Sequence, residues 1–262
     1  MQIKKILIIV LSIALLTAFN VFNSLKINPT QLTIREETLK SDKIDSSFDG
    51  KIIAYFSDLN YGGVIGKEEL EILIDTVNSV NPDIVLFGGD LLFTDSVDTD
   101  MMIEELSSIR SGIGKYYVLG EEDGGLAEDI LTSSGFESLD GSSIQVYSKN
   151  GSAINLAGMS IDGNYDDTNL TSDYTIFLTH YPDNAANIYN ADYILAGHSL
   201  GGRVYFPIIS AFIDMDGASR YKHGKHNVNS ATLDITNGVG TKEKSARFLA
   251  DAEVVFYKLS SN

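Results

Sequence analysis

The chain has 262 residues and no cysteine, and 36 acidic residues against 19 Lys and Arg give it a formal net charge of −17. Its length allows one large domain or two small ones. The absence of cysteine excludes disulfides, thiolate catalysis and cysteine-ligated zinc. Because an acidic surface repels phosphate backbones, we expect no nucleic acid partner, and a phosphorylated ligand would need local positive charge such as a metal ion.

Residues 6–25 form an uncharged stretch rich in Ile, Leu, Val and Ala. As a helix it would span about 30 Å, the thickness of a bilayer core. A cleaved signal peptide has a shorter apolar region and a small-x-small cleavage site, and Ala14 and Ala18 lack that spacing, so we favour an uncleaved anchor. Two lysines precede the stretch and only Lys26 follows it directly. The positive-inside rule then predicts a single-pass protein of the cell membrane, with residues 1–5 cytoplasmic and the main domain outside.

The chain after the anchor divides into a linker and one folded domain. Residues 26–48 are polar and poorly periodic, which predicts a linker with one short strand over residues 31–35. The folded domain is expected over residues 49–260.

The first half of this domain alternates strand and helix patterns. Apolar runs predict buried strands at 51–56, 84–87 and 116–119. Apolar spacings of three and four predict a helix over 67–80, ended by Pro82, and a further helix is expected near 98–110. This alternation predicts a parallel sheet with crossover helices. Polar residues at the carboxyl ends of its strands should meet at one edge, where such sheets bind ligands.

The second half is richer in strands. They are expected at 143–147, 152–159, 175–179, 193–196, 203–206 and 254–259. The predicted fold class is therefore α/β, with two mixed β-sheets packed face to face and flanked by helices in four layers.

Five short blocks follow these strands. They are Ser57-Asp58-Leu59-Asn60, Gly89-Asp90-Leu91, Gly120-Glu121-Glu122-Asp123, Thr179-His180-Tyr181-Pro182 and Gly197-His198-Ser199-Leu200-Gly201-Gly202. In order and spacing the chain resembles the calcineurin-like metallophosphoesterases, whose blocks are D-x-H, G-D, G-N-H-[DE], H-x-P and G-H-[ST]-H-G-G. Asn237-Gly238-Val239-Gly240 and Arg247-Phe248 resemble the branch of that family with a single N-terminal membrane anchor.

The resemblance implies a metal centre with two sites, of which this chain keeps one set of ligands. For one metal the family pattern maps onto Asp90, His180 and His198, with Glu121 in place of an Asn. These ligand types suit one Mn, Fe or Zn ion.

The other metal site is degenerate. It shares Asp90 and keeps Asp58, but its two histidines are replaced by Asn60, a weak ligand, and Leu200, which is none. We therefore expect one divalent ion, with a second doubtful.

The catalytic His of the family is replaced by Glu122. Glu122 would act as a general acid only if its pKa rose toward neutrality. A nearby cation would lower that pKa, whereas the adjacent Glu121 and Asp123 would raise it, and an ionised Glu122 would repel a phosphate.

Three further residues allow two interpretations each. Arg203 would contact a phosphate or form a surface ion pair. His223 and His226 fall in residues 221–229, expected to be a solvated loop, with a flap over the site as the alternative.

Two functions therefore stay open. One is a membrane-anchored phosphoester or phosphodiester hydrolase with weak or altered activity. The other is a catalytically dead pseudoenzyme that binds a phosphorylated small molecule, a phosphorylated lipid or a protein partner. No motif indicates the substrate.

Overall fold

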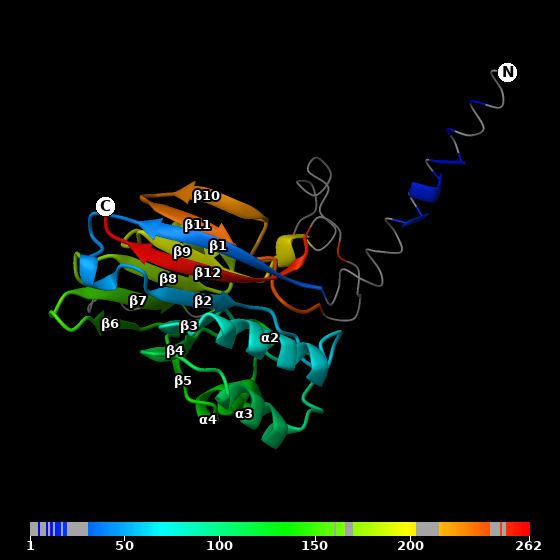
Figure 1. Ribbon diagram of the computed structural model, residues 1–262, viewed down its shortest axis with the longest axis horizontal. Coiled ribbons are helices and arrows are strands. Elements are labelled where there is room, and N and C mark those ends of the chain that lie inside the picture. Colours follow the sequence, from blue (N-terminus) through cyan, green and yellow to red (C-terminus); the bar gives the residue numbers. More distant parts are fainter. Residues whose placement is uncertain are drawn as a thin grey trace.

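The computed structural model describes residues 31–159, 161–165, 170–202, 215–241, 247 and 250–262, together with isolated helical positions between residues 5 and 19. Two six-stranded β-sheets lie face to face, and helices cover the outer side of the first (Figure 1).

The first sheet has the strand order β1-β12-β2-β3-β4-β5. Its strands are β1 (Leu32–Lys40), β2 (Ile52–Phe56), β3 (Ile84–Phe87), β4 (Gly114–Tyr117), β5 (Phe136–Ser138) and β12 (Ala252–Ser260). Only the pairing of β12 with β2 is antiparallel. The parallel pairs bring the loops after β2, β3 and β4 to one rim.

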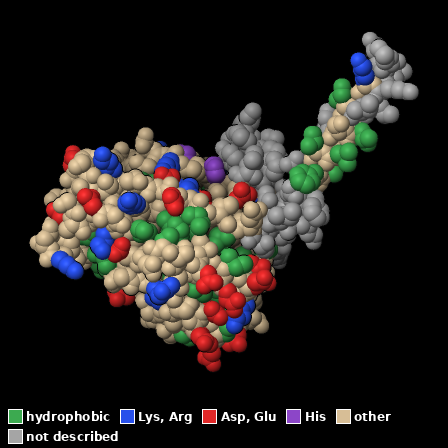
Figure 2. Space-filling model, in the orientation of Figure 1, with side chains coloured by type: hydrophobic (Ala, Val, Ile, Leu, Met, Phe, Trp, Pro, Cys, Tyr) green, Lys and Arg blue, Asp and Glu red, His purple; other side chains and the backbone are tan. Residues whose placement is uncertain are grey.

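Helices α2 (Lys67–Ser79), α3 (Thr99–Ser107) and α4 (Gly125–Ser133) cover one face of this sheet (Figure 1). In α2 the buried residues Leu70, Leu73, Ile74 and Val77 recur at helical spacing, and Glu69 closes the first turn by accepting the Gly66 N–H. The helices pack on residues such as Phe56 and Phe87. On the face shown in Figure 2, acidic side chains gather at the end of the molecule where α2 and α3 lie.

The second sheet has the order β10-β11-β9-β8-β7-β6. Its strands are β6 (Ser143–Tyr147), β7 (Ala153–Met159), β8 (Thr175–Thr179), β9 (Tyr193–Ala196), β10 (Gly224–Val228) and β11 (Ala231–Ile235). Strands β7, β8, β9 and β11 run parallel, and β6 and β10 are antiparallel edge strands.

Apolar side chains from both sheets form the central core. Tyr55 and Leu86 of the first sheet and Leu156, Ile176 and Leu195 of the second belong to this cluster. The outer face of the second sheet packs on the 3₁₀ helix η2 (Pro182–Asn187) and neighbouring loops. The α/β sandwich of two mixed sheets is thus confirmed. In the described part of the chain, however, α-helices flank the first sheet only.

The start of the domain differs from the expectation. The linker predicted over residues 26–48 contains β1, nine residues long, and the 3₁₀ helix η1 (Ser46–Phe48). Strand β1 pairs along its length with β12. Its alternating polar sequence has no apolar run because it is an edge strand, buried on one side at most.

The predicted anchor over residues 6–25 lies for the most part outside the described residues. Within the part of the chain that the structure describes, no helix combines the length and apolar character needed to cross a bilayer. The strand expected at residues 203–206 also lies outside the described residues.

Candidate metal centre

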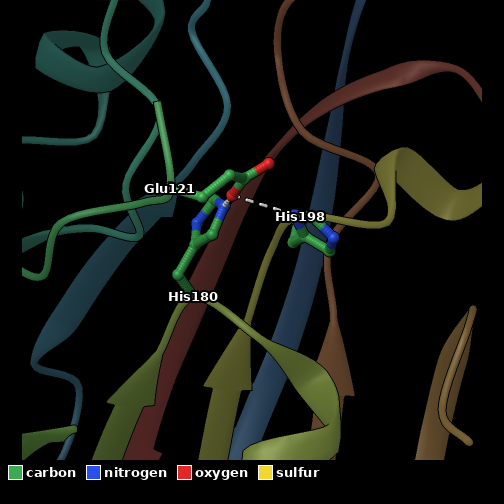
Figure 3. Close-up of side chains that lie close together, drawn as sticks. All are labelled: Glu121, His180 and His198. Carbon is green, nitrogen blue, oxygen red and sulfur yellow. Dashed lines mark hydrogen bonds and ion pairs between the residues drawn. The ribbon is translucent and has the colours of Figure 1, made fainter. Parts of the chain in front are cut away.

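Five side chains from separate loops converge at the rim of the two sheets. Asp58 follows β2, Asp90 follows β3 and Glu121 follows β4, whereas His180 and His198 follow β8 and β9. Figure 3 shows Glu121 between the rings of His180 and His198. The carboxyl ends of parallel strands in both sheets therefore supply the site.

His180 is fully buried and held by two contacts. Its Nδ1 lies 2.6 Å from the Gly88 carbonyl oxygen. Because a carbonyl only accepts hydrogen bonds, Nδ1 carries the proton, and Nε2 is the nitrogen left to bind a metal. Nε2 lies 2.8 Å from Glu121 Oε2 and 3.6 Å from Asp90 Oδ1.

His198 is held in the same manner, through its other nitrogen. Its Nε2 lies 2.6 Å from the Asp216 carbonyl oxygen, so Nε2 donates a proton there. Its Nδ1 lies 3.1 Å from Glu121 Oε2. Both imidazoles therefore present a ligand nitrogen to the same carboxylate oxygen, with the opposite nitrogen fixed by a backbone carbonyl, as is usual for metal-binding histidines.

Asp58 and Asp90 lie close to His180 and are buried. The Asp58 carboxylate accepts the Ser57 hydroxyl and, at 3.1 and 3.2 Å, the His198 backbone N–H. Asp90 Oδ1 accepts the Glu122 N–H at 3.2 Å. The ligand atoms of Asp58, Asp90 and His180 lie within 4.8 Å of one another, as do those of Glu121, His180 and His198. His180 thus belongs to both groups.

Close backbone packing explains the glycines of these blocks. A Cβ on Gly120 would lie 2.3 Å from Asp90 Oδ1, and one on Gly197 would lie 2.6 Å from Asp58 Oδ2. Both separations are below contact distance, so any side chain there would displace a carboxylate. Asp58, Asp90 and His198 themselves have positive φ values of 53°, 59° and 64°. Such conformations are costly for these residues and cluster at functional sites.

The carboxylates give the site a strong affinity for positive charge. Burial lowers the pKa of His180, but the Glu121 hydrogen bond and the charges of Asp90 and Asp58 outweigh it and raise the pKa to about 10. Burial raises the pKa of Asp90 to about 7, because the opposing attraction of His180 is weaker. Burial also raises the pKa of Glu121, but contacts with His180 and His198 hold it well below its usual range.

Metal affinity should therefore depend on pH. An incoming ion must displace the His180 proton over most of the accessible pH range, so affinity for Mn²⁺ should rise about tenfold per pH unit between pH 7 and 9. Below pH 7 Asp90 also binds a proton, and the dependence should steepen. Competition with a chelating dye across pH 6–9 measures this, and a flat profile above pH 7 would contradict the assignment.

The degenerate positions lie in the same region. Asn60 is fully buried, and neither its side-chain oxygen nor its nitrogen has a hydrogen-bond partner among the described residues. Leu200 is buried. A Cβ added to Gly238 would lie 2.8 Å from Leu200 Cδ2 and also 2.8 Å from the Asp58 Cβ, so both side chains border the same point. Leu200 thus places an apolar group close to Asp58. Glu122 is exposed at the rim. Arg203 lies outside the described residues.

The residues present fit a divalent metal. Two oriented imidazoles and three carboxylates supply nitrogen and hard oxygen donors, a combination suited to Zn, Mn or Fe. A buried amide without partners, as at Asn60, costs about 1–3 kcal/mol unless water or a ligand satisfies it.

The solvated loop expected over residues 221–229 is wrong for residues 224–228, which form β10. His226 lies in that edge strand, and its Nε2 is 3.0 Å from the His223 carbonyl oxygen. His223 is half-buried, with Nδ1 3.1 Å from the position of a Cβ on Gly201. Lys225 and Asn227 of β10 are exposed. The strand therefore has no continuous apolar run in its sequence.

Sequence reasoning missed several groups that shape the site. Asp123 accepts the backbone N–H groups of Asp90, Leu91 and Gly120 at 2.8–2.9 Å. The sequence signal that could have indicated this role is the match of Asp123 to the acidic position of the third block. The carbonyls of Gly88 and Asp216 carry no signal, because any residue type supplies a carbonyl.

Arg247 is fully buried and supports the site from behind. Its guanidinium donates to the carbonyls of Asn237, Gly238, Gly240 and Ala250 at 2.8–3.2 Å. The Gly240 N–H in turn donates to the Asp58 carbonyl at 2.7 Å.

Replacing Arg247 should therefore destabilise the fold. Arg247→Ala removes the guanidinium donors from these four carbonyls, of which only that of Gly238 has a second described donor, the Glu253 N–H, and it should lower the free energy of unfolding by at least about 3 kcal/mol. Urea denaturation measures the loss, with the exposed Arg110→Ala as control. Equal stability of the two variants would contradict this role.

Comparison with known proteins gives several relatives. An uncharacterized metallophosphoesterase of Bacillus subtilis, YkuE, is 28% identical over 90% of this chain and 88% of its own length. Uncharacterized metallophosphoesterases of Campylobacter jejuni (Cj0846) and Helicobacter pylori are 28% and 26% identical, over 97% and 86% of this chain and 70% and 63% of their own lengths. A zebrafish protein named a transmembrane protein with metallophosphoesterase domain is 28% identical over 40% of this chain and 25% of its own length. No family model matches the chain.

Proposed function

Because this chain belongs to the calcineurin-like metallophosphoesterase family, we propose that it binds one divalent metal ion and hydrolyses a phosphoester or phosphodiester at a remodelled site. One observation carries the proposal: a single Glu121 oxygen lies 2.8 Å from His180 Nε2 and 3.1 Å from His198 Nδ1, with both opposite ring nitrogens fixed by backbone carbonyls. Metal-binding histidines usually have the second ring nitrogen fixed in this way.

Glu121, His180, His198 and Asp90 would hold the ion, which is expected to be Mn, Fe or Zn. When bound, such an ion supplies Lewis-acid polarisation of a phosphoryl oxygen and lowers the pKa of a coordinated water. Asp123 keeps the loops after β3 and β4 together through its three backbone contacts. This fixes Asp90 and Glu121 relative to each other.

Proton transfer to the leaving oxygen falls to Glu122 in this proposal. Glu122 adjoins the site, because its N–H donates to Asp90 Oδ1, and its side chain is exposed. A glutamate cannot supply the cationic proton donor that a His offers beside a phosphate, so we expect turnover well below that of an enzyme with a His at this position.

A second candidate function is binding without turnover. The observation in its favour is Leu200, whose buried side chain places a methyl group near Asp58 where the family has an imidazole. A pseudoenzyme of this kind would hold a phosphorylated small molecule, a phosphorylated lipid or a protein partner at the same rim.

We further propose a single-pass membrane protein with the N-terminus in the cytoplasm and the folded domain outside. The uncharged stretch over residues 6–25 and its flanking lysines support this. The zebrafish relative is also named a transmembrane protein.

The two functions are separated by Mn²⁺-dependent hydrolysis of an aryl phosphodiester by the full chain, beside His198→Ala. Turnover that is lost in His198→Ala supports the hydrolase. Turnover no higher than in that variant contradicts it and favours the binding function.

A further inference from the structure

Residues 215–221, here called the 215–221 loop, pack against His198. The Asp216 carbonyl accepts the His198 Nε2–H at 2.6 Å. Gly217 has a φ of 71°, and a Cβ there would lie 2.4 Å from Tyr181 Cδ1, so the loop backbone lies directly against the Tyr181 ring. That ring is 4.5 Å from the His198 ring, edge to face. His198 is thus enclosed by the loop and by Tyr181.

The 215–221 loop is anchored by one carboxylate. Asp183 accepts the backbone N–H groups of Ser219, Arg220 and Tyr221 at 2.8–3.2 Å, and the Ser219 hydroxyl at 2.8 Å. Its own N–H donates to the Gly217 carbonyl at 2.9 Å. Burial raises the pKa of Asp183, but these hydrogen bonds outweigh it and lower the pKa below its usual range. Charge-assisted bonds of this kind are about twice as strong as neutral ones.

The anchor and the metal centre share one short segment. Asp183 follows His180, Tyr181 and Pro182, so the segment that supplies one histidine also fixes the loop that orients the other. If the loop moved away, His198 would lose its Nε2 acceptor, and either ring nitrogen would then be free to face Glu121.

We propose that Asp183 is a positioning residue for the metal centre, which acts through the 215–221 loop to hold His198 with Nδ1 toward Glu121. The inference rests on the proposed metal site and adds a residue that contacts neither the ion nor the substrate. Loss of such an outer contact typically weakens metal affinity about 10–100-fold.

Asp183→Asn tests the inference in the full chain, with Asp192→Asn as the matched control. Asn keeps the size of Asp but directs an NH₂ group at backbone donors. Asp192 likewise accepts a backbone N–H, that of Thr175 at 2.9 Å, and its other carboxylate oxygen accepts from Lys43. We expect Asp183→Asn to weaken Mn²⁺ binding about 10–100-fold, and Asp192→Asn to leave it within about twofold.

Nuclear magnetic resonance supplies a second readout that reports directly on the His198 ring. In the metal-free protein the His198 Nε2–H should give a slowly exchanging ¹⁵N-coupled proton signal, assigned by its loss in His198→Ala. The signal should persist in Asp192→Asn and disappear in Asp183→Asn. Retention in Asp183→Asn, or equal loss of affinity in both variants, would overturn the inference. Neither readout requires hydrolysis, so a chain that proved inactive would leave this test intact.

Discussion

Restoring the four family residues should raise phosphodiesterase activity by at least about two orders of magnitude. The variant combines Asn60→His, Glu121→Asn, Glu122→His and Leu200→His. A His at position 122 returns a general acid, a group that typically contributes about 10²–10⁴-fold. His at positions 60 and 200 returns the two imidazole ligands that the family pattern combines with Asp58 and Asp90, both of which are buried. The measurement is Mn²⁺-dependent hydrolysis of an aryl phosphodiester beside the unchanged protein.

The design needs a folding control and a partial variant. Asn60 is fully buried, so its enlargement is the change most prone to disturb packing. Glu122→His alone alters an exposed side chain and should raise activity by part of the full amount. A folded quadruple variant without any gain would show that the four positions do not limit catalysis.

Removing His180 should weaken metal binding more than the loss of any outer contact does. His180 Nε2 contacts both Glu121 and Asp90, and His180 belongs to both groups of candidate ligands. Its loss therefore disrupts either possible site, and we expect His180→Ala to weaken Mn²⁺ affinity by more than the roughly 10–100-fold typical of outer contacts. Isothermal titration calorimetry measures it.

His226→Ala is the control, because His226 lies in β10 and its ring contacts the His223 carbonyl and the Tyr221 ring, neither of which is a candidate ligand. That variant should bind Mn²⁺ as the unchanged chain does. Equal binding by His180→Ala and the unchanged chain would place the metal elsewhere.

The fold could be predicted where burial leaves a continuous apolar run. Residues 84–87 and 175–179 are buried along their whole length and form β3 and β8 as expected. Strand β1 was predicted only in part, over residues 31–35, and β10 was missed, because edge strands expose alternate side chains and polar exposed strands look like loops in sequence. Strand β11 was also missed, although it is mostly buried. Helix α4 was missed as well; its N-cap is a glycine without a side-chain capping bond.

The site could be predicted as a set of residues but not as a geometry. The strand-end positions of Asp58, Asp90 and Glu121 follow from the alternation of strands and helices. Which nitrogen each histidine offers depends on the carbonyls of Gly88 and Asp216. Asp216 lies 18 residues beyond His198 in the chain, and its approach depends on tertiary contacts through Asp183 that no local pattern specifies.

The most direct test of the metal centre is an anomalous diffraction map from crystals of the protein loaded with Zn²⁺. We predict one strong peak per chain, about 2.0–2.2 Å from His180 Nε2, His198 Nδ1 and a Glu121 carboxylate oxygen. A peak bound through His180 Nδ1 or His198 Nε2, or no peak among these three side chains, would contradict the account.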